Sequence, residues 1–345
     1  MSDPPQSNPP QSNPPLSNPL NLKTALREQA LRLGFIDMGI SRAEPLDRES
    51  KRLREWLKSG NHGTMGWMER NFEKRTDPRE LVPGAISVIS VLENYFKPIP
   101  HSTQPKTGRI SRYAWGDDYH LVMREKLQAL LSWLQEQSGA EGRVFVDSAP
   151  VMDKAWAARS GLGWIGKHSN LISATHGSWF FIGELIVDIE LEPDERAADM
   201  CGTCTRCLDA CPTDAITRPY VVDSKRCISY LTIEHREDDI SSDLQARLGN
   251  WIYGCDICQD VCPWNRFSQP ASETRYDPRP GTLDTRLADW ADMEEADFRK
   301  RFSKSPVKRT KWNGFIRNVR MARQNAGEPD SSETTSSRSA GESET

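Results

Sequence analysis

The sequence predicts an α+β fold followed by a smaller region of a different kind. Apolar residues recur at helical spacing in some stretches and form short strand-like runs in others, without the regular alternation of a βαβ repeat. All 8 cysteines lie between residues 201 and 262. A chain of 345 residues can bury a sizeable core and hold more than one domain. We therefore expect an α+β domain over residues 21–195 and a cysteine-rich domain over residues 196–270.

Both ends of the chain have the composition of disordered tails. Residues 1–20 repeat a short proline-rich unit, and residues 326–345 are rich in serine, threonine, glycine and glutamate. The N-terminal stretch lacks the charged and apolar regions of a signal peptide. The most apolar run, residues 179–191, is short and contains acids, so we expect no membrane span. The composition predicts a soluble, cytoplasmic protein.

The formal net charge of -4 at pH 7 comes mostly from the acidic C-terminal tail, and the rest of the chain is close to neutral. Overall charge therefore favours no class of partner. Residues 299–323 are an exception within the C-terminal segment 271–325, because they are rich in lysine and arginine, contain no acid and have Phe302, Trp312 and Phe315 interleaved. Such a run is either a solvated helix face or a contact for nucleic-acid phosphates. The neutral surroundings and the aromatics favour the second.

Local signals place the elements of the first domain. The first helix begins at the capping residue Asn21 and stops at Gly34, and the second helix stops before Gly60. Continuous, mostly apolar runs indicate buried strands. The expected helices span residues 21–33, 47–58, 119–137 and 151–160, and the expected strands span residues 35–40, 85–92, 143–145, 171–173 and 179–188.

Two segments of this domain are candidates for contact with a bound group. Gly161, Gly163 and Gly166 would let the backbone approach something flat or large. They follow a helix instead of joining a strand to its start, so they are not a dinucleotide-binding motif. Residues 108–120 gather aromatic and arginine side chains at a helix entrance, which suits either local packing or a cofactor wall.

The cysteines follow the pattern of bacterial ferredoxins. Three cysteines at x2 spacing are followed after three residues by a fourth and a proline, a pattern whose fourth thiolate binds the other cluster. A second run also ends in Cys-Pro, and short helices over residues 220–231 and 244–252 are expected between them. Zinc sites usually show two separated pairs, and a disulfide framework is unexpected in a reducing compartment. We predict two [4Fe-4S] clusters, with Cys201, Cys204, Cys207 and Cys262 on one and Cys211, Cys227, Cys255 and Cys258 on the other.

Several motifs in combination resemble one family. They are ISRYAWG at residues 110–116, FVDSAP at residues 145–150, GLGWIGK at residues 161–167, the 8 cysteines, and KWNGFIRN at residues 311–318. Over residues 22–323 the chain resembles the epoxyqueuosine reductase family, tRNA-modifying enzymes related to cobalamin-dependent reductive dehalogenases. The resemblance implies a nitroreductase-like cobalamin-binding domain followed by a ferredoxin-like domain with two [4Fe-4S] clusters.

The resemblance also implies a reaction. The epoxide of epoxyqueuosine, at the wobble position of a tRNA with a GUN anticodon, would be reduced to the alkene of queuosine in the last step of queuosine biosynthesis. Clusters deliver electrons singly, whereas reduced cobalamin can act as a two-electron nucleophile. An external low-potential donor would supply the electrons. Asp147 would be the proton donor; its alternative role is to cap the helix that follows.

The resemblance further implies contact residues. Leu171 and Ile182 offer only apolar or backbone contact and suit plain core positions equally well. The basic segment would grip the tRNA. The implied cobalamin contacts are Arg75, Ser111, Asp147, Leu171 and Ile182, and the expected tRNA contacts are Lys308, Arg309, Lys311 and Arg317.

Two other functions fit part of the pattern. A reductive dehalogenase acting on small organohalides would not need the basic segment and usually carries an export signal. A ferredoxin-type electron carrier would not need the long region ahead of the cysteines. We therefore expect a monomeric oxidoreductase that acts on tRNA.

Overall fold

The structure is a computed structural model that describes residues 19–328. Residues 1–18 and 329–345, most of the predicted tails at residues 1–20 and 326–345, lie outside this range. Pro19 already belongs to the first helix, so the helix begins before the expected residue 21. In the described part of the chain, no helix has the length and apolar character needed to cross a membrane.

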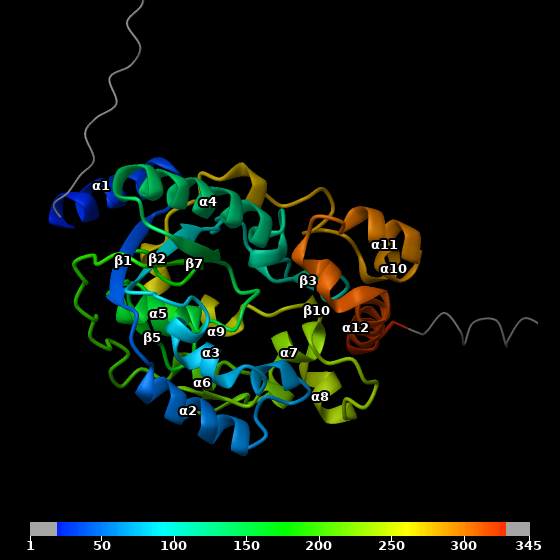
Figure 1. Cartoon of the computed structure of the whole chain (residues 1–345). Coiled ribbons are helices and arrows are strands. Elements are labelled where there is room, and N and C mark those ends of the chain that lie inside the picture. Colours follow the sequence, from blue (N-terminus) through cyan, green and yellow to red (C-terminus); the bar gives the residue numbers. More distant parts are fainter. Residues whose placement is uncertain (1–18, 329–345) are drawn as a thin grey trace, which may run out of the picture.

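A four-stranded antiparallel sheet forms the centre of the first domain (Figure 1). Its strands lie in the order β1 (Asp37–Arg42), β2 (Ser87–Asn94), β7 (Phe180–Val187) and β4 (Gly142–Phe145). The central strands β2 and β7 are buried along nearly their whole length, as mostly apolar runs predict. All four strands were expected, with ends shifted along the chain. A separate hairpin pairs β5 (Trp164–Ile165) with β6 (Leu171–Ile172).

Helices cover both faces of the sheet. The helices α1 (Pro19–Arg32) and α4 (Tyr119–Ser138) lie over one face, and α5 (Asp153–Arg159) lies over the other. Ile89 and Leu185 pack with the apolar side chains of α1 and α4, whereas their neighbours Val88 and Ile186 pack with Trp156 of α5. Successive strand residues point to opposite faces, so each of these strands contributes side chains to the apolar cores on both faces of the sheet.

Both ends of α4 follow from local chemistry. The Asp118 side chain accepts a hydrogen bond from the His120 amide, which satisfies a donor of the first turn. Gly139 ends the helix with φ of 72°, a conformation that suits glycine. The expected helix over residues 119–137 is therefore confirmed, and its first residue, Tyr119, is held in place by the cap.

The segment between β1 and β2 packs against the cysteine-rich region, residues 201–262. It contains α2 (Asp47–Lys58) and α3 (Phe72–Thr76), which lie beside that region in Figure 1. Trp56 Nε1 donates to the Val222 carbonyl at 2.7 Å, and the Thr64 amide donates to the Tyr230 hydroxyl at 2.7 Å. These bonds fix α3, and with it Arg75, between the two parts of the molecule.

Short elements build the cysteine-rich region. The expected single helix over residues 244–252 is wrong, because Gly249 at φ 58° turns the chain and residues 251–253 form a strand parallel to β3 (Arg109–Ile110). The expected helix over residues 220–231 begins only at Ile228, since Val221 and Val222 pair in a hairpin. The elements are α6 (Arg206–Asp209), β8 (Ile216–Arg218), β9 (Val221–Val222), α7 (Ile228–Ile233), α8 (Ser242–Arg247), β10 (Trp251–Tyr253) and α9 (Ile257–Asp260).

The C-terminal segment forms its own apolar core. Its helices are α10 (Leu287–Ala291), α11 (Glu295–Arg301) and α12 (Lys311–Asn325), which gather at β10 and β3 in Figure 1. Phe302 and Phe315 are fully buried in this core with Trp290, and Trp312 packs against it. The interpretation of these interleaved aromatics as nucleic-acid contacts is therefore wrong. Single 3-10 turns cover residues 66–68, 78–80, 112–114, 224–226, 263–267, 274–276 and 306–310.

Candidate active site and cluster-binding region

Asp147 lies on the loop that follows β4, directly ahead of α5. Its backbone φ is 49°, in the left-handed region that residues other than glycine, asparagine and aspartate seldom adopt. Its side chain is 60% exposed, with His120 Nε2 at 3.9 Å from Oδ2. The Tyr119 hydroxyl donates to the same oxygen at 2.7 Å. The loop thus presents a carboxyl group that can reach a bound substrate.

The alternative role of Asp147, as a helix cap, does not hold. The helix that follows it, α5, begins at Asp153, and the residue at its cap position is Met152. No side chain caps this helix. Helix capping therefore does not explain the position and exposure of Asp147.

Two basic side chains lie near the Asp147 carboxylate. Arg75 is buried, and burial lowers its pKa while the charges of Asp153 and Asp147 act in the opposite direction. Burial also lowers the pKa of Lys154, whereas the charges of Asp147 and Asp153 raise it. Lys154 is exposed, and its Nζ donates to the Ser169 carbonyl at 3.1 Å and to Asn170 Oδ1 at 2.7 Å. We call Arg75, Asp147, Asp153 and Lys154 the Asp147 site.

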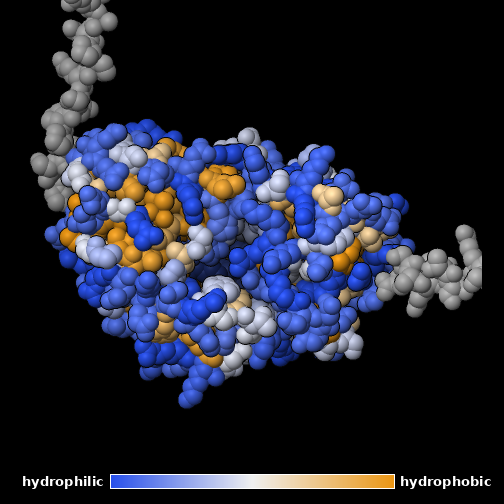
Figure 2. Space-filling model, turned by 45° about the vertical axis from the view of Figure 1, so that its right-hand side comes forward, coloured by the Kyte–Doolittle hydropathy of each residue, from blue (hydrophilic) through white to orange (hydrophobic). Residues whose placement is uncertain are grey.

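Asp153 and Lys154 were not among the residues expected from the sequence. They lie just after the FVDSAP motif, at the start of α5. Their closeness in sequence to Asp147 was the signal that could have identified them as site residues. Figure 2 shows that the molecule is hollowed near the centre of the face it draws.

The other expected cobalamin contacts come from several elements of the fold. Arg75 Nε is buried and has no hydrogen-bond partner among the described residues, so it can donate to a bound group. Leu171 is buried and Ile182 is half-buried, and both join one apolar cluster on the α5 side of the sheet. Ser111 is buried, and its hydroxyl donates to Asp256, next to Cys255. A free cationic donor and an apolar wall fit a large macrocycle with amide side chains.

The glycine segment serves the packing of the chain itself. A Cβ at Gly161 would meet the Glu195 carbonyl, and one at Gly163 would meet the Ile172 carbonyl. The close backbone approach is thus to the protein's own loop and strand, and the expected approach to a bound group is not needed to explain these glycines. Residues 108–120 likewise supply core side chains, since Ile110 and Trp115 are almost fully buried.

The structure gathers the first set of four cysteines. Burial raises the pKa of Cys207 to about 11, and the charges of Cys201, Cys262 and Cys204 add to this effect. Burial likewise raises the pKa of Cys262, with Cys201 and Cys204 contributing. Four thiols that oppose one another's ionisation lie close together, and bound iron is what stabilises such a group as thiolates.

The cysteines of the second set also influence one another's ionisation. Burial raises the pKa of Cys255, and Cys258 and Cys227 contribute to the shift. Burial raises the pKa of Cys227, backbone hydrogen bonds at Tyr230 and Ser229 lower it, and the charge of Cys211 raises it. The charge of Cys207 also acts on Cys258, so the two sets are neighbours. The arrangement suits two clusters that exchange electrons.

Hydrogen-bond donors surround the sulfur atoms. Trp164 Nε1 donates to Cys201 Sγ at 3.4 Å, and the Ala215 amide donates to Cys211 Sγ at 3.3 Å. Lys167 Nζ donates to the carbonyl groups of Gly202 and Cys204 at 2.7 and 2.9 Å. Donors and a buried cation of this kind stabilise negative charge on cluster sulfurs and fix the loop that carries them.

The second set lies on the side of the Asp147 site. Burial lowers the pKa of Lys154, and the charges of Asp147 and Asp153 raise it. Cys258 and Cys227 of the second set also raise this pKa. The second set therefore lies within electrostatic range of the Asp147 site.

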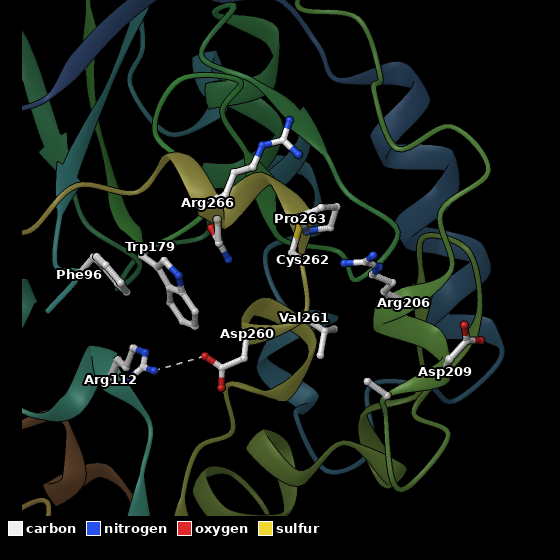
Figure 3. Close-up of a pocket in the computed structure, with 12 residues that line it drawn as sticks. Phe96, Arg112, Trp179, Arg206, Asp209, Asp260, Val261, Cys262, Pro263 and Arg266 are labelled. Atoms are coloured by element: carbon white, nitrogen blue, oxygen red, sulfur yellow. Dashed lines mark hydrogen bonds and ion pairs between the residues drawn. The ribbon is translucent and has the colours of Figure 1, made fainter. Parts of the chain in front are cut away.

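A cavity of about 770 Å³ opens beside the first set, at Cys262 (Figure 3). Phe96 and Trp179 form the opposite wall, with their rings stacked at 6.2 Å. Arg112 bridges to Asp260 at 3.4 Å across the lower part of the cavity. Its volume lies within the range of ligand pockets, about 300–1,000 Å³. Its other charged lining residues are Arg206, Asp209 and Arg266.

The four expected tRNA contacts fall into two groups. Lys308 lies 2.9 Å from Asp118, Arg309 pairs with Glu234, and Lys311 opens α12; all three side chains are exposed. Arg317 is only 8% exposed, and it donates to the carbonyl groups of Leu231, His235 and Glu237 at 2.7–3.0 Å. Arg317 is therefore a structural residue that joins α12 to α7, and the expectation that it contacts tRNA is corrected.

Comparison with known proteins identifies two family models. Residues 75–148 match the family described as "Epoxyqueuosine reductase QueG, DUF1730", and residues 200–265 match a "4Fe-4S double cluster binding domain". The first match begins at Arg75 and includes Asp147. The second includes all 8 cysteines.

Similar proteins cover nearly the whole chain. An epoxyqueuosine reductase of Cellulophaga algicola is 52% identical, with 85% of this chain and 95% of that protein aligned. One of Leadbetterella byssophila is 50% identical, with 87% and 97% aligned. A crystal structure of epoxyqueuosine reductase with an epoxyqueuosine-modified tRNA stem loop has a TM-score of 0.83 at 32% identity, covering 89% of this chain and 82% of that one.

A structure of epoxyqueuosine reductase from Bacillus subtilis has a TM-score of 0.83 at 31% identity, covering 92% of this chain and 84% of that one. In that structure an aspartate catalytic loop is described as swung out of the active site. The chain belongs to the epoxyqueuosine reductase family.

Proposed function

We propose that this protein reduces the epoxide of epoxyqueuosine in tRNA to the alkene of queuosine, with two [4Fe-4S] clusters and cobalamin as cofactors. The observation that carries the proposal is the placement of Asp147 on an exposed loop whose charged neighbours lie next to the second set of cysteines. Membership of the epoxyqueuosine reductase family supports the same reaction and does not favour a dehalogenase or a plain electron carrier.

The reaction consumes two electrons and two protons, and it converts an epoxide into an alkene and water. When bound, cobalamin supplies a two-electron nucleophile and the clusters supply one-electron transfer. Asp147 donates a proton to the epoxide oxygen as its ring opens, and Tyr119 orients the carboxyl group through its hydroxyl. The oxygen can then depart as water once a second proton arrives.

The residues proposed to hold cobalamin are Arg75, Ser111, Asp147, Leu171 and Ile182. Arg75 donates from Nε, which has no other partner among the described residues. Leu171 and Ile182 supply apolar contact from one cluster. Ser111 contributes a small side chain whose hydroxyl is already engaged by Asp256, so its role is to leave space. Asp147 completes the set.

We place the eight cysteines in the two predicted sets of four, as the arrangement of the thiols supports. Electrons enter at the first set, because this set is next to the solvent-open cavity lined by Cys262, Phe96 and Trp179. They pass to the second set, which lies toward the Asp147 site. An external low-potential donor reaches the protein at this cavity, where Arg206 and Arg266 supply positive charge.

The tRNA-binding surface is proposed to include Lys308, Arg309 and Lys311, which are exposed. Lys308 also bonds Asp118, whose carboxylate is 2.7 Å from His120 Nδ1. A phosphate held by Lys308 would therefore lie close to the residues around Asp147. The substrate is a tRNA with a GUN anticodon. Thiolate clusters require a reducing compartment, so the protein is cytoplasmic in this proposal. We also propose that it is a monomer.

The test is an anaerobic conversion assay. Purified protein with reconstituted clusters receives cobalamin, a low-potential reductant and tRNA bearing epoxyqueuosine, and the nucleoside is then measured by mass spectrometry. The proposal predicts the loss of one oxygen atom from the nucleoside, dependent on cobalamin. An unchanged nucleoside, with clusters and cobalamin shown to be bound, contradicts the proposed substrate.

A further inference from the structure

Glu184 is a buried acid that the mechanism above does not use. It lies on β7, on the face toward α5, and it is 0% exposed. Neither Oε1 nor Oε2 has a hydrogen-bond donor among the described residues. A carboxylate in such surroundings is strongly disfavoured, so Glu184 is expected to carry a proton.

Asp153 is the partner of this acid. It is the first residue of α5, and its Oδ1 is also buried without a donor among the described residues. Its carboxyl group and that of Glu184 are within hydrogen-bonding reach of each other. Two carboxylates have no hydrogen to share, so this contact forms only when one of the two holds a proton. One proton then satisfies both groups.

The pair connects the interior to the Asp147 site. Glu184 is fully enclosed, Asp153 is half-buried and Asp147 is exposed, so the three carboxyl groups form a path from the core outward. The charge of Asp147 acts on both members of the pair. The other ionisable groups that face the pair are Arg75 from α3, Tyr119 from α4 and Lys154 from α5.

We infer that the carboxyl pair of Asp153 and Glu184 stores protons and that Asp153 passes one of them to Asp147, which supplies the second proton that the reaction consumes. The inference rests on the proposed function. Asp147 first gives its own proton to the opened epoxide oxygen and becomes a carboxylate. A proton then moves from Asp153 to Asp147 through water, while the proton of Glu184 stays between the two carboxyl groups of the pair. Asp147 donates again as the hydroxyl group leaves as water, and solvent restores the proton of the pair.

The acidity of the pair suits this role. Burial raises the pKa of Asp153 to about 7, with a further contribution from the charge of Asp147. Burial and the charge of Asp153 raise the pKa of Glu184 well above its ordinary range. At neutral pH the pair therefore keeps the proton of Glu184, and Asp153 can release its own proton near the working pH, where a general acid is most effective.

The shared proton has a spectroscopic signature that does not depend on turnover. Infrared spectra of the protein with its clusters should show, at neutral pH, the carbonyl stretch of a protonated carboxyl group, shifted in D₂O. The band should disappear in Glu184→Gln, shift in frequency in Asp153→Asn because the hydrogen-bond partner of Glu184 changes, and stay unchanged in Glu136→Gln, which changes an exposed acid on α4. A wild-type protein without this band at neutral pH would overturn the inference.

The proton role is tested by single-turnover rates. Asp153→Asn should slow conversion by about 100-fold while leaving the Kd for tRNA unchanged, and Asp153→Glu should recover part of the rate. The wild-type rate should fall as the pH rises through about 7, and this limb should be absent in Asp153→Asn. Circular dichroism and iron content check that each variant folds.

An Asp153→Asn rate and pH profile equal to wild type would overturn the inference. If the wild-type protein itself leaves epoxyqueuosine unchanged, the proposed function fails and the proton role fails with it. In that event the infrared band still decides separately whether the pair shares a proton.

Discussion

The Tyr119 hydroxyl group donates a hydrogen bond to Asp147 Oδ2 at 2.7 Å. The Tyr119 ring is itself fixed, because it stacks on Phe181 of β7 with a centroid distance of 4.2 Å and an interplanar angle of 6°. The capped start of α4 and the central strand β7 thus orient the carboxyl group of Asp147, an exposed loop residue with positive φ. Orientation of this acid comes from the core, although the acid itself lies at the surface.

Replacing Tyr119 by phenylalanine should slow turnover without loss of folding. The ring and its stacking on Phe181 stay, and only the hydrogen bond to Asp147 is lost. A hydrogen bond to a charged group contributes about 1.5–3 kcal/mol, so we expect a single-turnover rate about 10- to 100-fold lower. Tyr119→Phe with a wild-type rate would show that Asp147 is oriented by other contacts.

Neutralising the exposed basic residues should weaken tRNA binding. The triple variant Lys308→Ala, Arg309→Ala, Lys311→Ala should raise the Kd for tRNA and flatten its dependence on salt, because fewer counterions are released. The matched control replaces Arg48, Lys51 and Arg52, three exposed cations of α2, and should leave binding near wild type. Equal effects of the two triple variants would show that only general charge matters.

Replacing Arg317 by alanine should destabilise the protein. The change removes the donor from the carbonyl groups of Leu231, His235 and Glu237, and each of the two buried ones, Leu231 and His235, costs about 1–3 kcal/mol when unsatisfied. We expect a lower midpoint in chemical denaturation. Arg320→Ala, an exposed change on the same helix, is the control. If Arg317→Ala instead keeps full stability and loses tRNA affinity, the corrected assignment is itself wrong.

Removal of iron should loosen one part of the fold. The cysteine-rich region has short elements and relies on its clusters, whereas the sheet has cores on both faces. Hydrogen exchange after chelation should accelerate over residues 201–262 and stay slow in β2 and β7. Uniform acceleration over the whole chain would contradict this division.

The sequence predicted what depends on local patterns. Apolar runs located the four strands, and cysteine spacing indicated the two clusters. It could not show which polar residues are buried. Arg317 and the aromatics Phe302 and Phe315 had the composition of a nucleic-acid contact, yet the fold turns them inward. Asp153 and Glu184 are 31 residues apart along the chain, and only the packing of α5 on β7 brings them together.

The assignment of Asp147 as proton donor is the central claim, and one variant tests it most directly. Asp147→Asn keeps the size of the side chain and its contact with Tyr119 but removes the acid. We expect full incorporation of clusters and cobalamin, unchanged affinity for tRNA, and no formation of queuosine in an anaerobic single turnover measured by mass spectrometry. Formation of queuosine at the wild-type rate by Asp147→Asn would contradict the account.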